Sequence, residues 1–152
     1  MDSLQETLKR QISSMLKGTD CHLIEIRISN TKRFIIIRIF LDREVGFFSH
    51  RDCVEWSSHI RDEIDAKNLV PGDYRLEISS PGIERPLRER WEFKKNCEKR
   101  LIAEYLGGDK TAHKFTGILT EVGDDGISLK SNKIVLQIPW NNLLKAKVLP
   151  PW

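Results

Sequence analysis

The sequence contains no long hydrophobic run and does not begin like a secretory signal. Its longest apolar stretch, residues 34–41, is interrupted by Arg38 and is far shorter than the roughly 20 residues that a membrane-spanning helix needs. The first residues include an early acid, Asp2, and no basic region followed by an apolar core. These absences argue against a membrane-spanning helix and predict a cytoplasmic protein.

Cysteine is scarce, and its spacing argues against two common uses. Cys21, Cys53 and Cys97 are an odd number at irregular intervals, which suits reduced thiols and predicts no structural disulfide. His50 and Cys53 stand three residues apart, but no second spaced pair completes a zinc-binding pattern. We therefore expect no metal site and no cofactor.

Recognisable catalytic motifs are also missing. Residues 79–82, Ser-Ser-Pro-Gly, lack both the Gly-x-Ser-x-Gly elbow of a nucleophile and the Gly-Lys-Ser/Thr of a phosphate-binding loop. The four histidines fit no known triad order. We predict a non-enzyme with no catalytic residues. The alternative is a hydrolase that uses Cys53 with His50, or an unrecognised pair of carboxylates.

The composition, with 39% hydrophobic and 31% charged residues, is typical of a soluble globular protein. Charge is divided unevenly along the chain. Residues 1–87 hold 13 Lys and Arg against 14 Asp and Glu, whereas residues 88–152 hold 12 against 8, so the net charges are −1 and +4. A basic surplus confined to the C-terminal part favours a nucleic-acid or ribosome partner, because clustered cations neutralise phosphates.

The first 80 residues predict an αββαβ order and an α+β fold. Apolar residues recur at helical spacing up to Leu16, and Ser49 with Asp52 three residues later predicts the start of a second helix. Alternating apolar residues predict three strands. The expected elements are helices over residues 4–16 and 49–67 and strands over residues 23–28, 33–41 and 74–78.

The rest of the chain predicts a small all-β barrel. Short alternating runs are separated by residues with good turn chemistry, and closure is how so small a sheet avoids exposed edges. Residues 139–142 predict a helical turn before the last strand. The expected strands cover residues 100–106, 114–122, 127–130, 133–138 and 144–149.

Two stiff breaks separate these halves. Pro81 and Gly82 stand where a type II turn places them, and Pro86 follows as a second break. We predict two domains, residues 1–84 and 85–152. The expected interdomain turn consists of Ser79, Ser80, Pro81, Gly82 and Pro86.

Residues 76–87, Leu-Glu-Ile-Ser-Ser-Pro-Gly-Ile-Glu-Arg-Pro-Leu, resemble the signature of the bacterial ribosome maturation factor family RimP. The similarity extends to Asp52-Cys53 in the second helix, Phe115-Thr116-Gly117 in a predicted barrel strand and Lys145-Ala146 near the end. The chain departs from the family pattern at residues 47–50, which read Phe-Phe-Ser-His, and at Ser58, where arginine is common. A role that depends on that arginine is therefore not carried over.

The resemblance implies an N-terminal sheet with both helices on one face and a C-terminal barrel of the Sm-like, Src-homology-3-like class. The implied function is to bind the immature small (30S) ribosomal subunit and promote its late assembly. The implied partners are 16S rRNA and a small-subunit ribosomal protein. The chain is expected to be a monomer, and no membrane is expected among its partners. A general RNA-binding or chaperone module is the alternative, although the sequence shows no Gly-x-x-Gly loop of the KH type and no aromatic RNP pattern.

A basic segment supplies the candidate ribosome contacts. These are Arg85, Arg88, Arg90, Lys94, Lys95, Lys99 and Arg100. Interspersed glutamates allow a different interpretation, a solvated helical face of ion pairs, and Arg85 is open to a role in pinning the linker. Trp91, Phe93 and Trp140 are predicted to pack in the core rather than to stack on bases.

The turns of the barrel supply further candidates for partner contact, Lys110, Asp124 and Asp125. The turn that contains Asp124 and Asp125 is acidic, so it suits a basic ribosomal protein better than RNA.

Overall fold

The computed structural model describes residues 2–82 and 85–150. The chain divides into two compact units, Met1–Pro81 (unit 1) and Gly82–Trp152 (unit 2). The predicted boundary after residue 84 adjoins residues 83 and 84, which lie outside the described part of the chain. Each unit has its own hydrophobic core.

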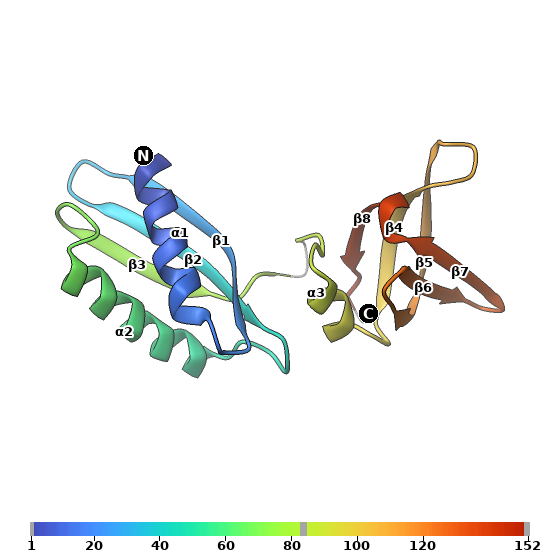
Figure 1. Ribbon diagram of the computed structural model, residues 1–152, viewed down its shortest axis with the longest axis horizontal. Helices are drawn as coiled ribbons and strands as arrows, with labels where there is room; N and C mark the ends of the chain where they lie inside the picture. Colours follow the sequence, from blue (N-terminus) through green and yellow to red (C-terminus); the bar gives the residue numbers. More distant parts are fainter. Residues whose placement is uncertain (1, 83–84, 151–152) are drawn as a thin grey trace. The chain divides into compact units, whose positions relative to one another are not determined.

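Unit 1 has the predicted αββαβ order (Figure 1). Helix α2 begins where the sequence predicts, because the Asp52 backbone N–H donates to Ser49 Oγ at 3.1 Å and the Ser49 N–H donates to Asp52 Oδ2 at 2.8 Å. The elements are α1 (Asp2–Leu16), β1 (Cys21–Asn30), β2 (Ile35–Arg43), α2 (His50–Lys67) and β3 (Tyr74–Ser79).

The sheet of unit 1 has β2 at its centre, antiparallel to β1 and parallel to β3. Ile37, Ile39 and Leu41 alternate along β2 and are fully buried, so they define one face of the sheet. Leu8 of α1 and Ile60 of α2 belong to the same core cluster. Both helices therefore cover that face, as the sequence predicts.

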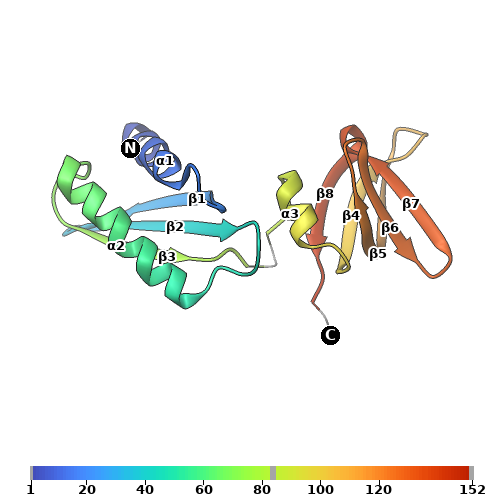
Figure 2. The same cartoon turned by 60° about the horizontal axis from the view of Figure 1, so that its bottom comes forward.

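Unit 2 is a curved antiparallel sheet preceded by a short helix, which the sequence offers only in the ion-pair interpretation of the basic segment (Figure 2). The 3-10 turn η1 stands where a helical turn was expected. The elements are α3 (Arg90–Lys95), β4 (Arg100–Leu106), β5 (Ala112–Val122), β6 (Gly126–Ser131), β7 (Ile134–Pro139), η1 (Trp140–Asn142) and β8 (Leu143–Val148).

The strands of unit 2 follow the order β7-β6-β5-β4-β8. Within residues 85–150 no ladder joins the end strands β7 and β8, so closure of the predicted barrel is not confirmed. The inner face is nonetheless a packed core, because Leu101, Leu119 and Leu129 are fully buried on neighbouring strands. The α+β class is confirmed for the chain as a whole.

None of the described helices is both long and apolar enough to cross a membrane.

Candidate functional site

Helix α3 organises the basic segment through one buried carboxylate. Glu92 is only 5% exposed, and its Oε2 accepts a hydrogen bond from Arg85 Nη1 at 2.9 Å. Its other oxygen, Oε1, accepts from the backbone N–H groups of Glu89 at 3.0 Å and Arg88 at 3.3 Å. Arg85 is therefore held inside unit 2, which agrees with a role in pinning the linker.

Arg90 also has partners within unit 2. Its guanidinium lies over the Trp140 ring at 5.3 Å from the centroid, and its Nη1 is 3.9 Å from Asp124 Oδ1. Trp140 packs edge-to-face on Phe93 with centroids 5.1 Å apart and donates from Nε1 to the Gly123 carbonyl at 3.0 Å. Phe93 and Trp140 thus join α3 to the β5–β6 turn, and their packing agrees with a core role.

The other cations of the segment face solvent to different degrees. Arg88, Lys94, Lys99 and Arg100 are exposed, whereas Lys95 is half-buried. The ammonium of Lys99 donates to Asn96 Oδ1 at 3.0 Å. The predicted contact set therefore separates into Arg85, which is bound to a buried carboxylate, and a group of mostly solvent-facing cations that includes Arg90.

The structure separates the two barrel turns that the sequence groups together. Lys110 lies in the β4–β5 turn, while Asp124 and Asp125 lie in the β5–β6 turn at the other end of β5. In the first turn the Thr111 backbone N–H and the His113 ring hold the pKa of Asp109 at about 2. Lys110 itself adopts a left-handed φ of 64°.

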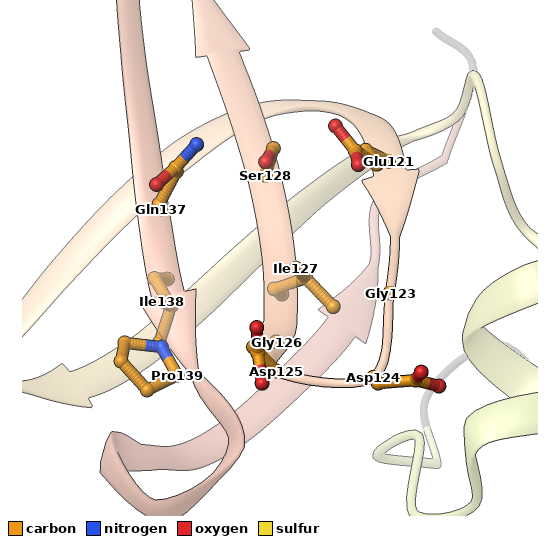
Figure 3. A pocket seen from close by; sticks show the side chains of 10 residues that line it. All are labelled: Glu121, Gly123, Asp124, Asp125, Gly126, Ile127, Ser128, Gln137, Ile138 and Pro139. Atoms are coloured by element: carbon orange, nitrogen blue, oxygen red, sulfur yellow. The ribbon is translucent and has the colours of Figure 1, made fainter.

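The β5–β6 turn borders a shallow hollow of about 490 Å³ (Figure 3). Glu121, Ser128 and Gln137 lie side by side on β5, β6 and β7, and the exposed Asp124 and Asp125 project from the turn. Three carboxylates border the hollow and one cation, Arg90, lies 3.9 Å from Asp124 Oδ1, so this end of the sheet has an excess of negative charge. Such a site suits a lysine or arginine side chain of a partner.

The predicted interdomain turn follows β3 directly. Ser79 ends the strand opposite Phe40, and Ser80 beside it is exposed. The φ of Gly82 lies outside the left-handed region, so the type II turn expected from Pro81 and Gly82 is wrong. A Cβ on Gly82 would meet nothing within 4 Å. Pro86 is half-buried in unit 2.

The candidate nucleophile pair of the hydrolase alternative lines an open hollow between α2 and the end of β3. His50 and Cys53 both border it, together with Ser79 and Ser80. Burial, and then the charge of Asp52, raise the pKa of the Cys53 thiol. A nucleophilic cysteine needs the thiolate, which a raised pKa disfavours at neutral pH. The raised pKa therefore argues against Cys53 as the nucleophile of the hydrolase alternative.

In the described part of the chain, no three or more His, Cys, Asp or Glu side chains gather in a way that would hold a metal ion.

The sequence does not reveal a three-residue ion network in unit 1. Arg43 at the end of β2 binds Asp20 through Nε at 3.0 Å and Nη2 at 3.2 Å, and its Nη1 lies 3.1 Å from Asp52 Oδ2. These residues come from the loop before β1, the end of β2 and the first turn of α2. The Asp52 cap was visible in the sequence, but its cationic partner depends on the fold.

The network predicts a pH-dependent stability for unit 1. The hydrogen bond from Arg43 is the main cause that lowers the pKa of Asp20, and the Ser49 backbone N–H is the main cause that lowers the pKa of Asp52. Carboxylates with a lowered folded pKa stabilise the fold above their unfolded pKa of about 4, and this stabilisation is lost as the pH falls through the folded pKa. We expect the urea midpoint of unit 1 to fall as the pH is lowered from about 5 toward 2.

The Arg43→Gln variant should show a smaller fall, because Asp20 loses the main cause of its lowered pKa while Asp52 keeps Ser49. NMR signals of β2 followed through urea titrations would measure this. Arg38→Gln is the control, because Arg38 pairs with the exposed Glu77 at 3.1 Å and neither residue belongs to the network. Equal pH dependence in the wild type and Arg43→Gln would contradict the prediction.

Comparison with known families assigns unit 1. Residues 11–84 match the family model described as the RimP N-terminal domain. The match includes β1, β2, α2 and β3 and the Ser-Ser-Pro-Gly segment on which the sequence resemblance rests. The chain belongs to the RimP family of ribosome maturation factors.

Proposed function

We propose that this chain is a non-enzymatic factor that binds the immature small ribosomal subunit and promotes its late assembly. The observation that carries the proposal is the match of residues 11–84 to the RimP N-terminal domain. The partners would be 16S rRNA and a small-subunit ribosomal protein. The factor would act as a cytoplasmic monomer without a cofactor.

Two surfaces of unit 2 support partners of these kinds. The solvent-facing cations of the basic segment, Arg88, Lys94, Lys99 and Arg100, suit rRNA phosphates. The acidic hollow beside Asp124 and Asp125 suits a basic ribosomal protein. Opposite charges on the two surfaces would let one unit contact RNA and protein at the same time.

The mechanism follows from differential affinity. A factor that binds an assembly intermediate more tightly than the mature subunit stabilises the intermediate, and it leaves when the mature surface no longer offers its contacts. Such a factor breaks no bond.

The finer fold assignments are part of the proposal. We infer an Sm-like, Src-homology-3-like class for unit 2, supported by five short antiparallel strands with η1 directly before the last strand. The two domains would be residues 1–84 and 85–152, joined at Ser79, Ser80, Pro81, Gly82 and Pro86.

Sedimentation with isolated small subunits, large subunits and complete ribosomes tests the proposal. Co-migration with small subunits alone is the expected result. Binding to every particle and to free RNA would favour a general RNA-binding module. Failure to bind any particle would overturn the proposal.

Charge reversal should weaken subunit binding. We expect Lys94→Glu/Lys95→Glu/Lys99→Glu/Arg100→Glu to reduce affinity by roughly tenfold or more at low salt and by less at high salt, because salt screens phosphate contacts. The control reverses four charges of unit 1, with Lys9→Glu/Arg10→Glu/Lys17→Glu/Lys32→Glu. Unchanged affinity of the first variant would leave the basic segment as a solvated face of ion pairs.

A further inference from the structure

The strand register gathers cations that the sequence scatters over 48 positions, from residue 100 to residue 147. Arg100 of β4 lies opposite Ile118, which lies opposite Lys130 of β6. In the next row Ile102 stands between Lys147 and Thr116, and in the row after it Glu104 stands between Lys145 and Lys114. Directly paired residues point to the same face of a sheet. We call the face formed by these three rows the outer face.

Burial confirms that the outer face is the solvent side of the sheet. The alternate residues Leu101, Ala103, Leu119, Leu129 and Ala146 are buried in the core of unit 2. On the outer face, Arg100, Lys114, Lys130 and Lys145 are exposed and Lys147 is half-buried. Adjacent residues of a strand point to opposite faces, so the cations project away from the core.

The outer face has a strong excess of positive charge. Its three rows carry the five cations Arg100, Lys114, Lys130, Lys145 and Lys147 and one carboxylate, Glu104. Among residues 85–150 no carboxylate oxygen lies within 4 Å of a nitrogen of these five side chains. The adjoining row contains Glu121, Ser128 and Gln137 and leads to the acidic hollow, so it ends the basic surface.

The spacing of the cations suits an extended polyanion. Neighbouring strands lie about 4.8 Å apart, and side chains two residues apart on one strand are separated by about 6.6 Å. A grid with these spacings presents several ammonium groups to consecutive phosphates at once. Lysine is a flexible point charge that contacts phosphates without reading bases.

We propose that the outer face of unit 2 binds the phosphate backbone of RNA. The charge favours RNA over a basic protein partner, because clustered cations neutralise phosphates and repel other cations. The face also lacks an aromatic anchor, and its exposed apolar residues Ile118 and Val135 stand beside Lys130 rather than in a pocket. The inference rests on the proposed function only in taking ribosomal RNA as the natural ligand.

Fluorescence anisotropy of the full-length protein tests the assignment. The probes are a labelled oligouridine of about 20 nucleotides and an RNA duplex of about 16 base pairs. The variant Lys114→Gln/Lys130→Gln/Lys145→Gln should bind either probe roughly tenfold more weakly at about 50 mM salt. The slope of log affinity against log salt should decrease by about 2 to 3.

A matched control distinguishes the loss of cations from the outer face from a mere decrease in the net charge of the protein. Lys9→Gln/Lys17→Gln/Lys32→Gln removes the same charge from exposed positions of unit 1 and should lower affinity less than twofold. Lys114→Arg/Lys130→Arg/Lys145→Arg should retain binding. Equal losses in the two glutamine variants, or no RNA binding by the wild type, would overturn the inference.

Competition and sedimentation complete the test. If oligoglutamate competes as well as unlabelled RNA of equal charge, the face accepts any polyanion, acidic proteins included, and the RNA assignment is overturned. Sedimentation with ribosomal subunits distinguishes failure of the outer-face assignment from failure of the proposed function. If Lys114→Gln/Lys130→Gln/Lys145→Gln keeps both its small-subunit binding and its RNA affinity, the outer-face assignment alone is overturned. If the wild type binds RNA but no small subunit, the proposed function alone is overturned.

Discussion

Gly126→Ala should destabilise unit 2 by about 3 kcal/mol or more, because the new methyl group has no room. An ideal Cβ at Gly126 would lie 2.1 Å from the Ile138 carbonyl oxygen and 2.8 Å from the Pro139 Cα. Both are backbone atoms of β7, which pairs with β6 at this point. If these atoms belonged to a flexible side chain, that side chain could rotate away. Because they are backbone atoms, the new Cβ can be accommodated only if β7 moves away from β6.

Urea titration followed by NMR signals of β4 and β6 measures this loss in unit 2 alone. Gly108→Ala is the control, because a Cβ there would meet nothing within 4 Å and the φ of Gly108 is outside the left-handed region. At such a position alanine is neutral or slightly stabilising. Similar urea midpoints for the two variants would show that the β6–β7 pairing tolerates displacement and would contradict the prediction.

Unit 1 was predictable because its signals are local and agree with one another. The spacing of Leu8, Ile12 and Leu16 indicates a helix, and Ser49 with Asp52 marks the start of the next one. Each of these signals depends on a few neighbouring residues. The parallel pairing of β2 with β3 needs only that α2 cross over the sheet between them.

Helix α3 was not among the predicted elements because it is short, although Glu92 caps its first turn and Lys94 and Lys95 lie in its last turn. It is six residues long, too short to be stable through helix propensity alone. It depends on contacts made across the fold, which include Phe93 on Trp140 and Arg85 on Glu92. Closure of the barrel is not confirmed, and alternation and turn residues locate strands without determining whether the end strands pair.

The candidate site was predicted from charge, and the structure adds the partners of its residues. Sequence proximity put Arg85 and Arg90 among the contact residues, yet both have acidic partners inside unit 2. Sequence distance hid Lys114, Lys130 and Lys145, which only the register of β4, β5, β6 and β8 brings to one face. Lysines at alternate positions of several strands were the available signal.

The Arg85→Met variant should destabilise unit 2 by about 3 kcal/mol, because it leaves a buried carboxylate without its cation. The side chains of Arg85 and Glu92 are 20% and 6% exposed, so water cannot replace the lost partner fully. The control Arg88→Met removes an exposed arginine of the same segment and should change the free energy of unfolding by less than about 0.5 kcal/mol. NMR signals of β4 and β6 through a urea titration again report unit 2.

A second substitution separates the charge of Glu92 from its role as an acceptor. Glu92→Gln keeps an oxygen for the backbone N–H groups of Glu89 and Arg88 while it removes the buried charge. Arg85→Met/Glu92→Gln should therefore recover about half or more of the stability that Arg85→Met loses, since a neutral amide costs less to bury than a carboxylate. If the double variant is as unstable as the sum of the single variants, the two side chains are not coupled. If Arg85→Met is as stable as the wild type, Arg85 is available for a partner and belongs again with the contact residues.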